Sequence, residues 1–288
     1  MKLQGNTVLV TGGASGIGRC IVQELLARDN TVIVCGRDPR KLQALRQDLP
    51  QVKTIVADLS SPAEVERLAE QLLQEAPALN GVIHSAAVQN NSLMTDDDYA
   101  PQRIDEEVRI NLVAPMLLTK LLLPTLRRRD AAFLVNITSG LAMVPKTRSA
   151  VYCGTKGGLR IFSQSLRHQL RGSPVRVVEL LPPVVDTPMT HGRAEGLKIS
   201  PEEVARALMR GLERDQEEIR VGKVKLLAWL QRLAPGTAAR VMSRLALIPL
   251  LLATRALAVE EIRPPAPVAT PAAIDQKGVV TQGAVRIL

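Results

Sequence analysis

Tyr152 and Lys156 are the residues of this chain whose types and spacing point most directly to chemistry. They lie four positions apart, and Ser139 precedes the tyrosine by thirteen positions. Residues four apart share one face of a helix, so the Lys156 ammonium would lie beside the Tyr152 phenol. A neighbouring cation favours the phenolate and brings a pKa of about 10 toward neutrality, and Ser139 would hold the oxygen that exchanges the proton. The same spacing also arises by chance, as an exposed aromatic beside a solvated charge.

A glycine-rich turn near the start of the chain predicts where a cofactor would lie. The apolar run TVLVT at 7–11 leads into TGGASGIG, and helical apolar periodicity follows. Glycines allow a left-handed backbone and close approach of a pyrophosphate, which the free N–H groups of a helix N-terminus bind. Such turns also occur without ligands, but strand, glycines and helix in this order favour dinucleotide binding. The residues expected there are Gly12, Ser15, Gly16, Ile17 and Gly18.

The end of the next predicted strand, TVIVC at 31–35, bears on the choice of dinucleotide. Gly36 and Arg37 follow it, where an Asp or Glu would bind the 2′-hydroxyl of NAD. A guanidinium without a nearby carboxylate favours a 2′-phosphate, so NADP is predicted and NAD is less favoured. The alternative is that Arg37 only caps the helix that follows.

Further strands and helices alternate along the chain, which is typical of a parallel α/β sheet. Helices are predicted near 39–49, 62–75, 102–128 and up to 171, and strands at 52–56, 81–84, 131–138 and 175–181. Asp58 follows its strand and would accept from an adenine amino group or cap the next helix. His84 is expected to be structural, and no His, Cys or carboxylate cluster indicates a metal site.

The carboxyl ends of parallel strands are where such sheets bind ligands, and the candidate residues fall at these ends. The strand at 131–138 ends directly before Ser139, and the helix of Tyr152 follows. Asn111, inside the long helix, needs hydrogen-bond partners, either backbone groups or a water chain. The order of these elements predicts that the glycine turn, Asp58, Ser139 and Tyr152 converge.

Together these motifs resemble the compact type of the short-chain dehydrogenase/reductase family, over about residues 1–222. TGGASGIG, NITS, YCGTK and PPVVDTPM occur in the family's order, and 165–190 is similar to its DltE-like oxidoreductases. The resemblance implies a Rossmann-type, doubly wound parallel sheet of about seven strands. It also implies hydride transfer between nicotinamide and an alcohol or carbonyl, often in a homo-oligomer.

Roles follow from the resemblance, residue by residue. Tyr152 would be the acid/base, Lys156 would lower its pKa and bind the nicotinamide ribose, and Ser139 would orient the carbonyl. Asn111 would hold a relay water. The expected cofactor contacts are the glycine turn, Arg37, Asp58, Ser85, Tyr152, Lys156, Val185 and Thr187. Two positions depart from the family's pattern: HSAA with Ser85 replaces NNAG, and Pro183 replaces a glycine, which removes a backbone donor.

The rest of the chain differs in composition from the catalytic part. Residues 223–258 read as a helical extension in two pieces divided at Pro235–Gly236, and 259–288 as a disordered tail. The net charge of +9 lies mostly after residue 219, and the interspersed pattern favours solubility over nucleic-acid binding. The extension would contact a membrane surface peripherally, or pack on its own domain or a second subunit.

The leading hypothesis is therefore a cytoplasmic, NADP-dependent oxidoreductase acting on an apolar alcohol or ketone. An apolar wall is expected from Leu141, Met143, Val144, Pro145, Met189 and Leu197. Three cysteines at unrelated spacings and no signal peptide fit a reduced, cytosolic compartment. The alternative is a protein of the same fold that binds NADP as a sensor or scaffold without turnover.

Overall fold

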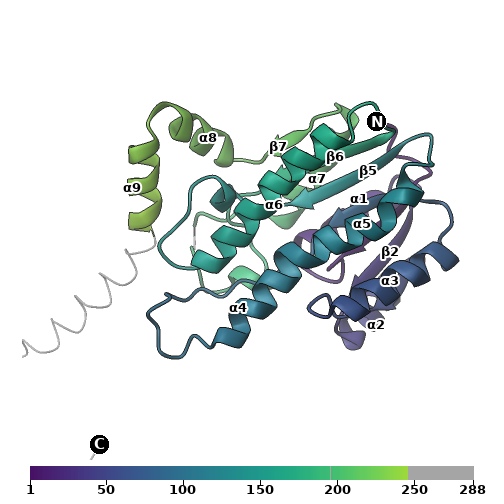
Figure 1. Cartoon of the computed structure of the whole chain (residues 1–288), viewed down its shortest axis with the longest axis horizontal. Helices are drawn as coiled ribbons and strands as arrows, with labels where there is room; N and C mark the ends of the chain where they lie inside the picture. Colours follow the sequence, from purple (N-terminus) through teal and green to yellow (C-terminus); the bar gives the residue numbers. More distant parts are fainter. Residues whose placement is uncertain (195, 246–288) are drawn as a thin grey trace, which may run out of the picture. The chain divides into compact units, whose positions relative to one another are not determined.

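The computed structural model describes residues 1–194 and 196–245. Within them, seven parallel strands form one sheet in the order β3-β2-β1-β4-β5-β6-β7 (Figure 1). The chain order reverses between β1 and β4, so the sheet has a switch point there, where α/β proteins bind ligands. The strands are β1 (Thr7–Thr11), β2 (Thr31–Gly36), β3 (Lys53–Val56), β4 (Leu79–His84), β5 (Ala132–Ile137), β6 (Val175–Leu181) and β7 (Glu218–Arg220).

Helices cover both faces of the sheet and bury separate apolar clusters. One cluster lies under α1, α2 and α7, and the other under α3, α5 and α6. These helices are α1 (Gly16–Leu26), α2 (Pro39–Asp48), α3 (Pro62–Glu75), α5 (Ala114–Leu126), α6 (Ala150–Gln169) and α7 (Pro201–Glu213). Because side chains alternate along a strand, Val8 and Val10 join the first cluster and Leu9 joins the second. The Rossmann-type fold predicted from the sequence is confirmed.

The long helix predicted at 102–128 is one continuous helical segment with a change of pitch. Helix α4 (Pro101–Val108) passes into a π-helical turn, Arg109–Val113, which continues as α5. Leu118, Leu122 and Leu126 of α5 are fully or almost fully buried in the second cluster. The segment 101–126 is long and apolar enough to cross a membrane by length and composition, but those leucines belong to the core of the sheet.

Most element boundaries agree with the sequence patterns to within two residues. Strand β7 and helix α7 lie in a stretch for which no element was predicted. The C-terminal extension contains α8 (Val224–Leu233) and α9 (Pro235–Leu245), and Pro235 occupies the first turn of α9, where its missing N–H costs nothing. The predicted helical residues 246–258 and the predicted tail lie outside the described residues.

Candidate active site

The glycine turn between β1 and α1 has a shape that only glycine permits. Gly12 has a φ of +66°, and a Cβ there would lie 2.8 Å from the Ala86 Cα. A Cβ on Gly18 would lie 2.5 Å from the Gly12 carbonyl oxygen and 2.9 Å from the Ser85 hydroxyl. Ser15 adopts an extended N-cap conformation but makes no capping hydrogen bond through its side chain. The first N–H groups of α1 are therefore left for another acceptor, as an anion site requires.

Loops from two other strands close around this turn. The Thr11 hydroxyl accepts hydrogen bonds from the N–H groups of Ser85 (3.0 Å) and Ala86 (3.1 Å), which fixes the segment after β4. The Thr187 side chain lies against Gly16, at 3.1 Å from a Cβ built there. Val185 is buried and its carbonyl accepts from the Thr190 hydroxyl. The structure thus brings together Gly12, Gly16, Gly18, Ser85 and Thr187, and their contacts with a cofactor stay a prediction.

Arg37, at the end of β2, already has a partner in the structure. Its guanidinium pairs with the Glu106 carboxylate at 2.5 Å, and this hydrogen bond raises the Arg37 pKa. It therefore does not cap α2, since Asp38 accepts the N–H of Arg40. Asp58 does not cap α3 either: it accepts from the N–H and hydroxyl of Ser60, and Ser61 is the N-cap.

The predicted reactive residues meet at the N-terminal half of α6. Tyr152, Lys156 and Ser139 are all buried, with at most 9 % of each residue exposed. The Lys156 ammonium lies 5.7 Å from the centre of the Tyr152 ring and donates to the Ile137 carbonyl at 2.8 Å. Ser139 caps a short 3-10 turn, and its hydroxyl accepts from the Leu141 N–H at 3.1 Å.

Burial controls the protonation of this group. It raises the pKa of Tyr152, while the Ser139 hydroxyl and the Arg193 charge act in the opposite direction. Burial also lowers the pKa of Lys156 to about 8, against the Glu107 carboxylate, which raises it. The Tyr152 pKa therefore lies above its usual value in this structure, because desolvation outweighs the neighbouring groups that lower it, and a lowering by Lys156 stays a prediction.

Asn111 lies in the π-helical turn and is fully engaged with protein groups. Its carbonyl oxygen accepts from the Val88 N–H at 2.9 Å, and its amide donates to the Val88 carbonyl at 2.8 Å and to the Thr155 hydroxyl at 3.3 Å. Asn111 was expected to bind either backbone groups or a water chain, and these contacts support the backbone groups. Asn111 joins the loop after β4 to helix α6 beside Lys156.

Glu107 is a buried carboxylate near this group that was not predicted from the sequence. It has no exposed surface, one oxygen accepts from the Asn90 amide at 2.9 Å, and the other has no hydrogen-bond partner among the described residues. Burial raises its pKa, and its charge acts on both Tyr152 and Lys156. The one sequence feature that could have indicated Glu107 is its position four residues before Asn111, on the same face of the helix.

The residues of the predicted apolar wall differ in their surroundings. Val144 is buried in the interior, and Met143 lines a groove toward α8. Arg193, whose charge acts on Tyr152, instead donates to the Gln89 side chain at 3.2 Å. Leu141 and Met189 are half-buried, and Leu197 is exposed.

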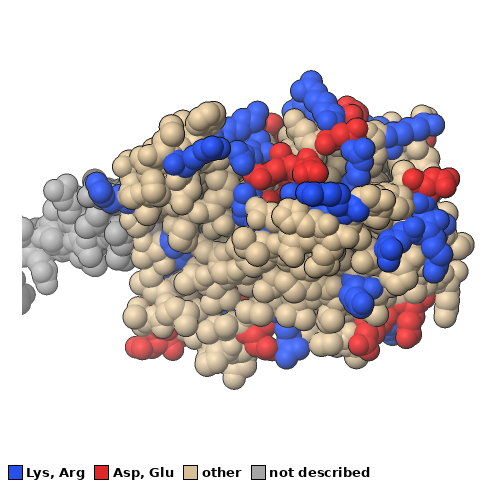
Figure 2. Space-filling view, turned by 45° about the horizontal axis from the view of Figure 1, so that its top comes forward, with Lys and Arg blue, Asp and Glu red and all other residues tan. Residues whose placement is uncertain are grey.

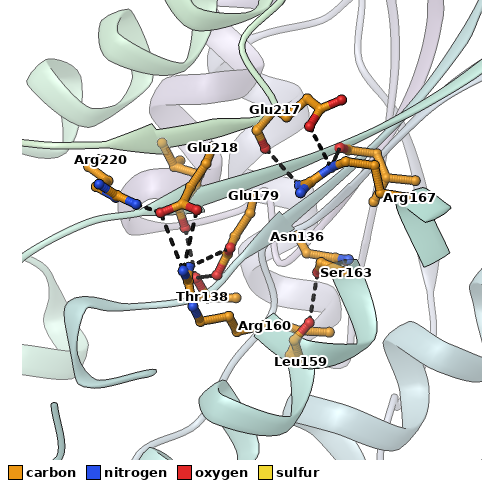
Figure 3. Close-up of polar contacts among 12 residues, drawn as sticks. Asn136, Thr138, Leu159, Arg160, Ser163, Arg167, Glu179, Glu217, Glu218 and Arg220 are labelled. Carbon is orange, nitrogen blue, oxygen red and sulfur yellow. Dashed lines mark hydrogen bonds and ion pairs between the residues drawn. The ribbon is translucent and has the colours of Figure 1, made fainter. Parts of the chain in front are cut away.

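A buried network anchors α6 to the sheet (Figure 3). The Arg160 guanidinium pairs with the Glu179 carboxylate of β6 at 2.7 Å and with Glu218 of β7 at 3.3 Å. Glu179 is completely buried and also accepts from the Thr138 hydroxyl at 2.7 Å. Arg160 lies one turn after Lys156, so these pairs hold the reactive helix against β6 and β7, and Glu179 in turn contacts Thr138, the residue before Ser139.

His84 has a structural environment, as predicted. Its ring lies 3.1 Å from the Thr119 hydroxyl, and burial, with a smaller effect of the Lys156 charge, lowers its pKa to about 3. Within residues 1–194 and 196–245, no three His, Cys, Asp or Glu side chains gather closely enough to hold a metal ion.

Known proteins share both the sequence pattern and the fold. Residues 6–198 match the short chain dehydrogenase family. An uncharacterized oxidoreductase, DltE, of Bacillus subtilis (strain 168) is 38 % identical over 232 residues, which cover 76 % of this chain and 89 % of the relative.

Two solved structures show the same fold at lower identity. A short chain dehydrogenase from Burkholderia cenocepacia J2315 in complex with NADP superposes with a TM-score of 0.75 at 22 % identity, covering 84 % of this chain and 99 % of that one. A short chain dehydrogenase/reductase from Burkholderia phymatum in complex with NAD gives 0.70 at 18 % identity, covering 81 % and 96 %. With the match of residues 6–198 and the relative at 38 % identity, these likenesses identify the chain as a member of the short-chain dehydrogenase/reductase family, an oxidoreductase that uses a nicotinamide cofactor.

Proposed function

We propose that this chain is an NADP-dependent oxidoreductase that interconverts an alcohol and a carbonyl compound with Tyr152 as the acid/base. The observation that carries the proposal is the meeting of Tyr152, Ser139 and Lys156 in one buried group. The glycine turn supports it, because a Cβ would fill the space at Gly12 and Gly18 and the N-terminus of α1 lacks a side-chain cap. The bound cofactor would supply the hydride.

The contacts support separate tasks for the three side chains. Tyr152, whose pKa is raised by burial, holds its proton and gives it to the carbonyl oxygen during reduction. Ser139 donates a hydrogen bond from its hydroxyl to the same oxygen and orients it. Lys156, with a pKa of about 8, is charged at neutral pH and favours the phenolate that proton donation leaves.

The chain's second tyrosine provides a matched control for this proposal. Tyr152→Phe is expected to lower kcat/KM by about 100-fold or more with NADPH and a panel of carbonyl compounds, as general acid loss does. Tyr99→Phe makes the same chemical change at a residue that interacts with Glu107 but not with Tyr152, and it is expected to stay within a few-fold. Equal activity of wild type and Tyr152→Phe would overturn the role of Tyr152. NADPH binding without oxidation by any carbonyl, unchanged in Tyr152→Phe, would instead favour a sensor or scaffold.

The preference for NADP rests on Arg37 and on the weakness of its present partner. The Arg37 and Glu106 side chains are 55 % and 39 % exposed, and such surface pairs contribute only about 0–1 kcal/mol. A 2′-phosphate offers more charge and more acceptors than one carboxylate, so it would displace Glu106. Arg37→Ala should weaken NADPH binding about tenfold or more and leave NADH binding unchanged. Arg40→Ala on α2 is the control, and equal wild-type affinities for the two cofactors would contradict the preference.

The substrate, assembly and location remain predictions of the same proposal. Leu141 and Met189, the half-buried members of the predicted apolar wall, are expected to contact an apolar part of the substrate. A homo-oligomer would use the apolar side chains that α5 and α6 expose, such as Ile161 (63 % exposed), and light scattering of the purified protein tests it. The family fold suggests a soluble protein, and a cytoplasmic location is expected.

The described surface gives different support to the two macromolecular partners considered. On the face drawn in Figure 2, basic and acidic side chains intermingle, and no continuous basic area of the kind nucleic acid requires is present there. Helix α8 instead exposes Leu226, Trp229 and Leu233, at 71 %, 62 % and 73 %. This spacing places them along one side of the helix, which supports a peripheral contact with a membrane.

A further inference from the structure

Two cations near Tyr152 have no acidic partner among the described residues. The Lys146 ammonium, before α6, donates to the Asn91 side-chain oxygen at 2.8 Å, and the Arg193 guanidinium donates to Gln89 at 3.2 Å. Both side chains are half-buried. Arg148, two residues after Lys146, pairs with Asp96 at 2.9 Å. A cation of the same loop thus has an acidic partner, in contrast to Lys146 and Arg193.

Hydrogen bonds connect the two cations around the start of α6. The Ser149 hydroxyl donates to Asn91, the acceptor of Lys146, at 3.2 Å. It also lies 3.5 Å from the Gln89 amide, the side chain that Arg193 contacts. Ser149 precedes the first residue of α6, and Tyr152 lies in the first turn. Ser149 therefore connects the hydrogen-bond partners of Lys146 and Arg193 at the start of the helix whose first turn holds Tyr152.

The charges of the two residues are unfavourable in the structure as it stands. Burial lowers the pKa of Lys146, and the Arg193 and Arg148 charges lower it further. Burial also lowers the pKa of Arg193, and Tyr152 is the ionisable group that opposes this. Two partly buried cations that repel each other gain stability when an anion lies between them, because charge-assisted hydrogen bonds replace the repulsion.

We propose that Lys146 and Arg193 bind an anionic group, a carboxylate or phosphate, of the substrate whose carbonyl or alcohol reacts at Tyr152. The inference rests on the proposed function and deepens it: the substrate has an apolar part, contacted by Leu141 and Met189, and an anionic end. The cofactor's pyrophosphate is a weaker candidate for the same cations. It is expected at the glycine turn, whereas Arg193 contacts Gln89 and acts on Tyr152.

Matched pairs of substrates test the inference directly. Straight-chain oxo acids and their methyl esters present the same ketone with and without a charge, and their reduction by NADPH is followed by absorbance. The wild type should prefer the acid of each pair. Lys146→Met and Arg193→Met should each raise KM for the acid about 10- to 100-fold, the range for hydrogen bonds to a charged group. Their kcat/KM for the ester should fall much less than that for the acid, so that the acid-to-ester ratio decreases, and Lys120→Met, an exposed cation on α5, should behave as wild type.

The outcomes separate this inference from the function on which it rests. If neither substitution changes the ratio of kcat/KM for the acid to kcat/KM for the ester, the anion site is overturned. The proposed oxidoreductase function would not be affected by that result. Weaker NADPH binding in both variants with an unchanged ratio would assign the cations to the cofactor and overturn the inference as well.

A binding measurement covers the case in which no oxo acid is reduced, which would count against the proposed function. The thermal stability of the NADP complex is then measured with and without each oxo acid. An increase with the acid but not with its ester, lost in Lys146→Met and Arg193→Met, would support the anion site. No increase in the wild type would overturn it.

Discussion

Burial moves the ionisable side chains around Tyr152 toward their neutral forms. It raises the pKa of Tyr152 and Glu107 and lowers that of Lys156 and His84. Each shift has the same cause, since taking a charge out of water costs free energy unless partners replace the solvent. The protein therefore holds a proton on Tyr152, and the charges that a cofactor and an anionic substrate bring would act in a poorly solvated environment.

His84 should make the protein sensitive to acid. A base whose folded pKa lies below its unfolded value binds fewer protons in the folded state, so its contribution to stability is lost as the pH falls. For His84 the window runs from about 6.5 down to about 3. Between pH ~6.5 and ~4 the loss approaches about 3 kcal/mol. His84→Gln should remove this part of the pH dependence, measured by urea unfolding across the range.

The exposed His168 supplies the comparison for that experiment. His168→Gln should lose stability toward acid as the wild type does, including the common contribution of the carboxylates. Identical slopes in wild type and His84→Gln would contradict the prediction.

At the scale of elements, α6 carries the reactive residues and β6 and β7 hold it in place. The strand patterns and the glycine turn predicted the sheet and the meeting of Ser139, Tyr152 and Lys156, because local periodicity and spacing determine these features. The Arg160–Glu179 pair, the position of Glu107 and the contacts of Lys146 and Arg193 could not be predicted. They depend on residues far apart in the sequence, whose pairing only the packing of α4, α6 and the loops decides.

Arg160→Met should destabilise the protein by about 3 kcal/mol, because it leaves the Glu179 carboxylate buried without its charged partner. Chemical denaturation measures the effect, and Arg128→Met, an exposed arginine after α5, is the control. Adding Glu179→Gln to Arg160→Met should restore part of the loss, because it removes the buried charge. An unchanged free energy of unfolding in Arg160→Met would show that the pair does not hold α6.

At the scale of the whole molecule, charge and apolar exposure both gather in the C-terminal helices. Residues 221–245 contain five Lys or Arg and no Asp or Glu. Their hydropathy pattern predicted two helices, and α8 and α9 bear this out for the described part. What the sequence could not tell is which side of α8 stays exposed, since that depends on how Val224 packs beside Gly140.

Replacing Leu226, Trp229 and Leu233 together by Ser should reduce binding to anionic vesicles about tenfold or more. Each apolar side chain that enters a bilayer interface contributes on the order of 1–2 kcal/mol when well buried. Co-sedimentation with phosphatidylserine-containing vesicles measures the effect, and Leu73→Ser, at an exposed apolar residue on α3, is the control. Equal sedimentation of wild type and triple variant, or none of the wild type, would remove the membrane contact and leave packing against protein as the role of this side.

The π-helical turn at Arg109–Val113 sets the rotational phase between the two halves of its helix. In an uninterrupted α-helix, Glu107 and Leu118 are eleven residues apart and would point within about 20° of each other. Glu107 would then project into the apolar layer that Leu118 fills. One additional residue in the turn rotates α4 by roughly 100° relative to α5 and directs the carboxylate toward α6. Deletion of a single residue from this turn would therefore rotate α4 relative to α5. A relative without the additional residue would need an apolar side chain at the position of Glu107.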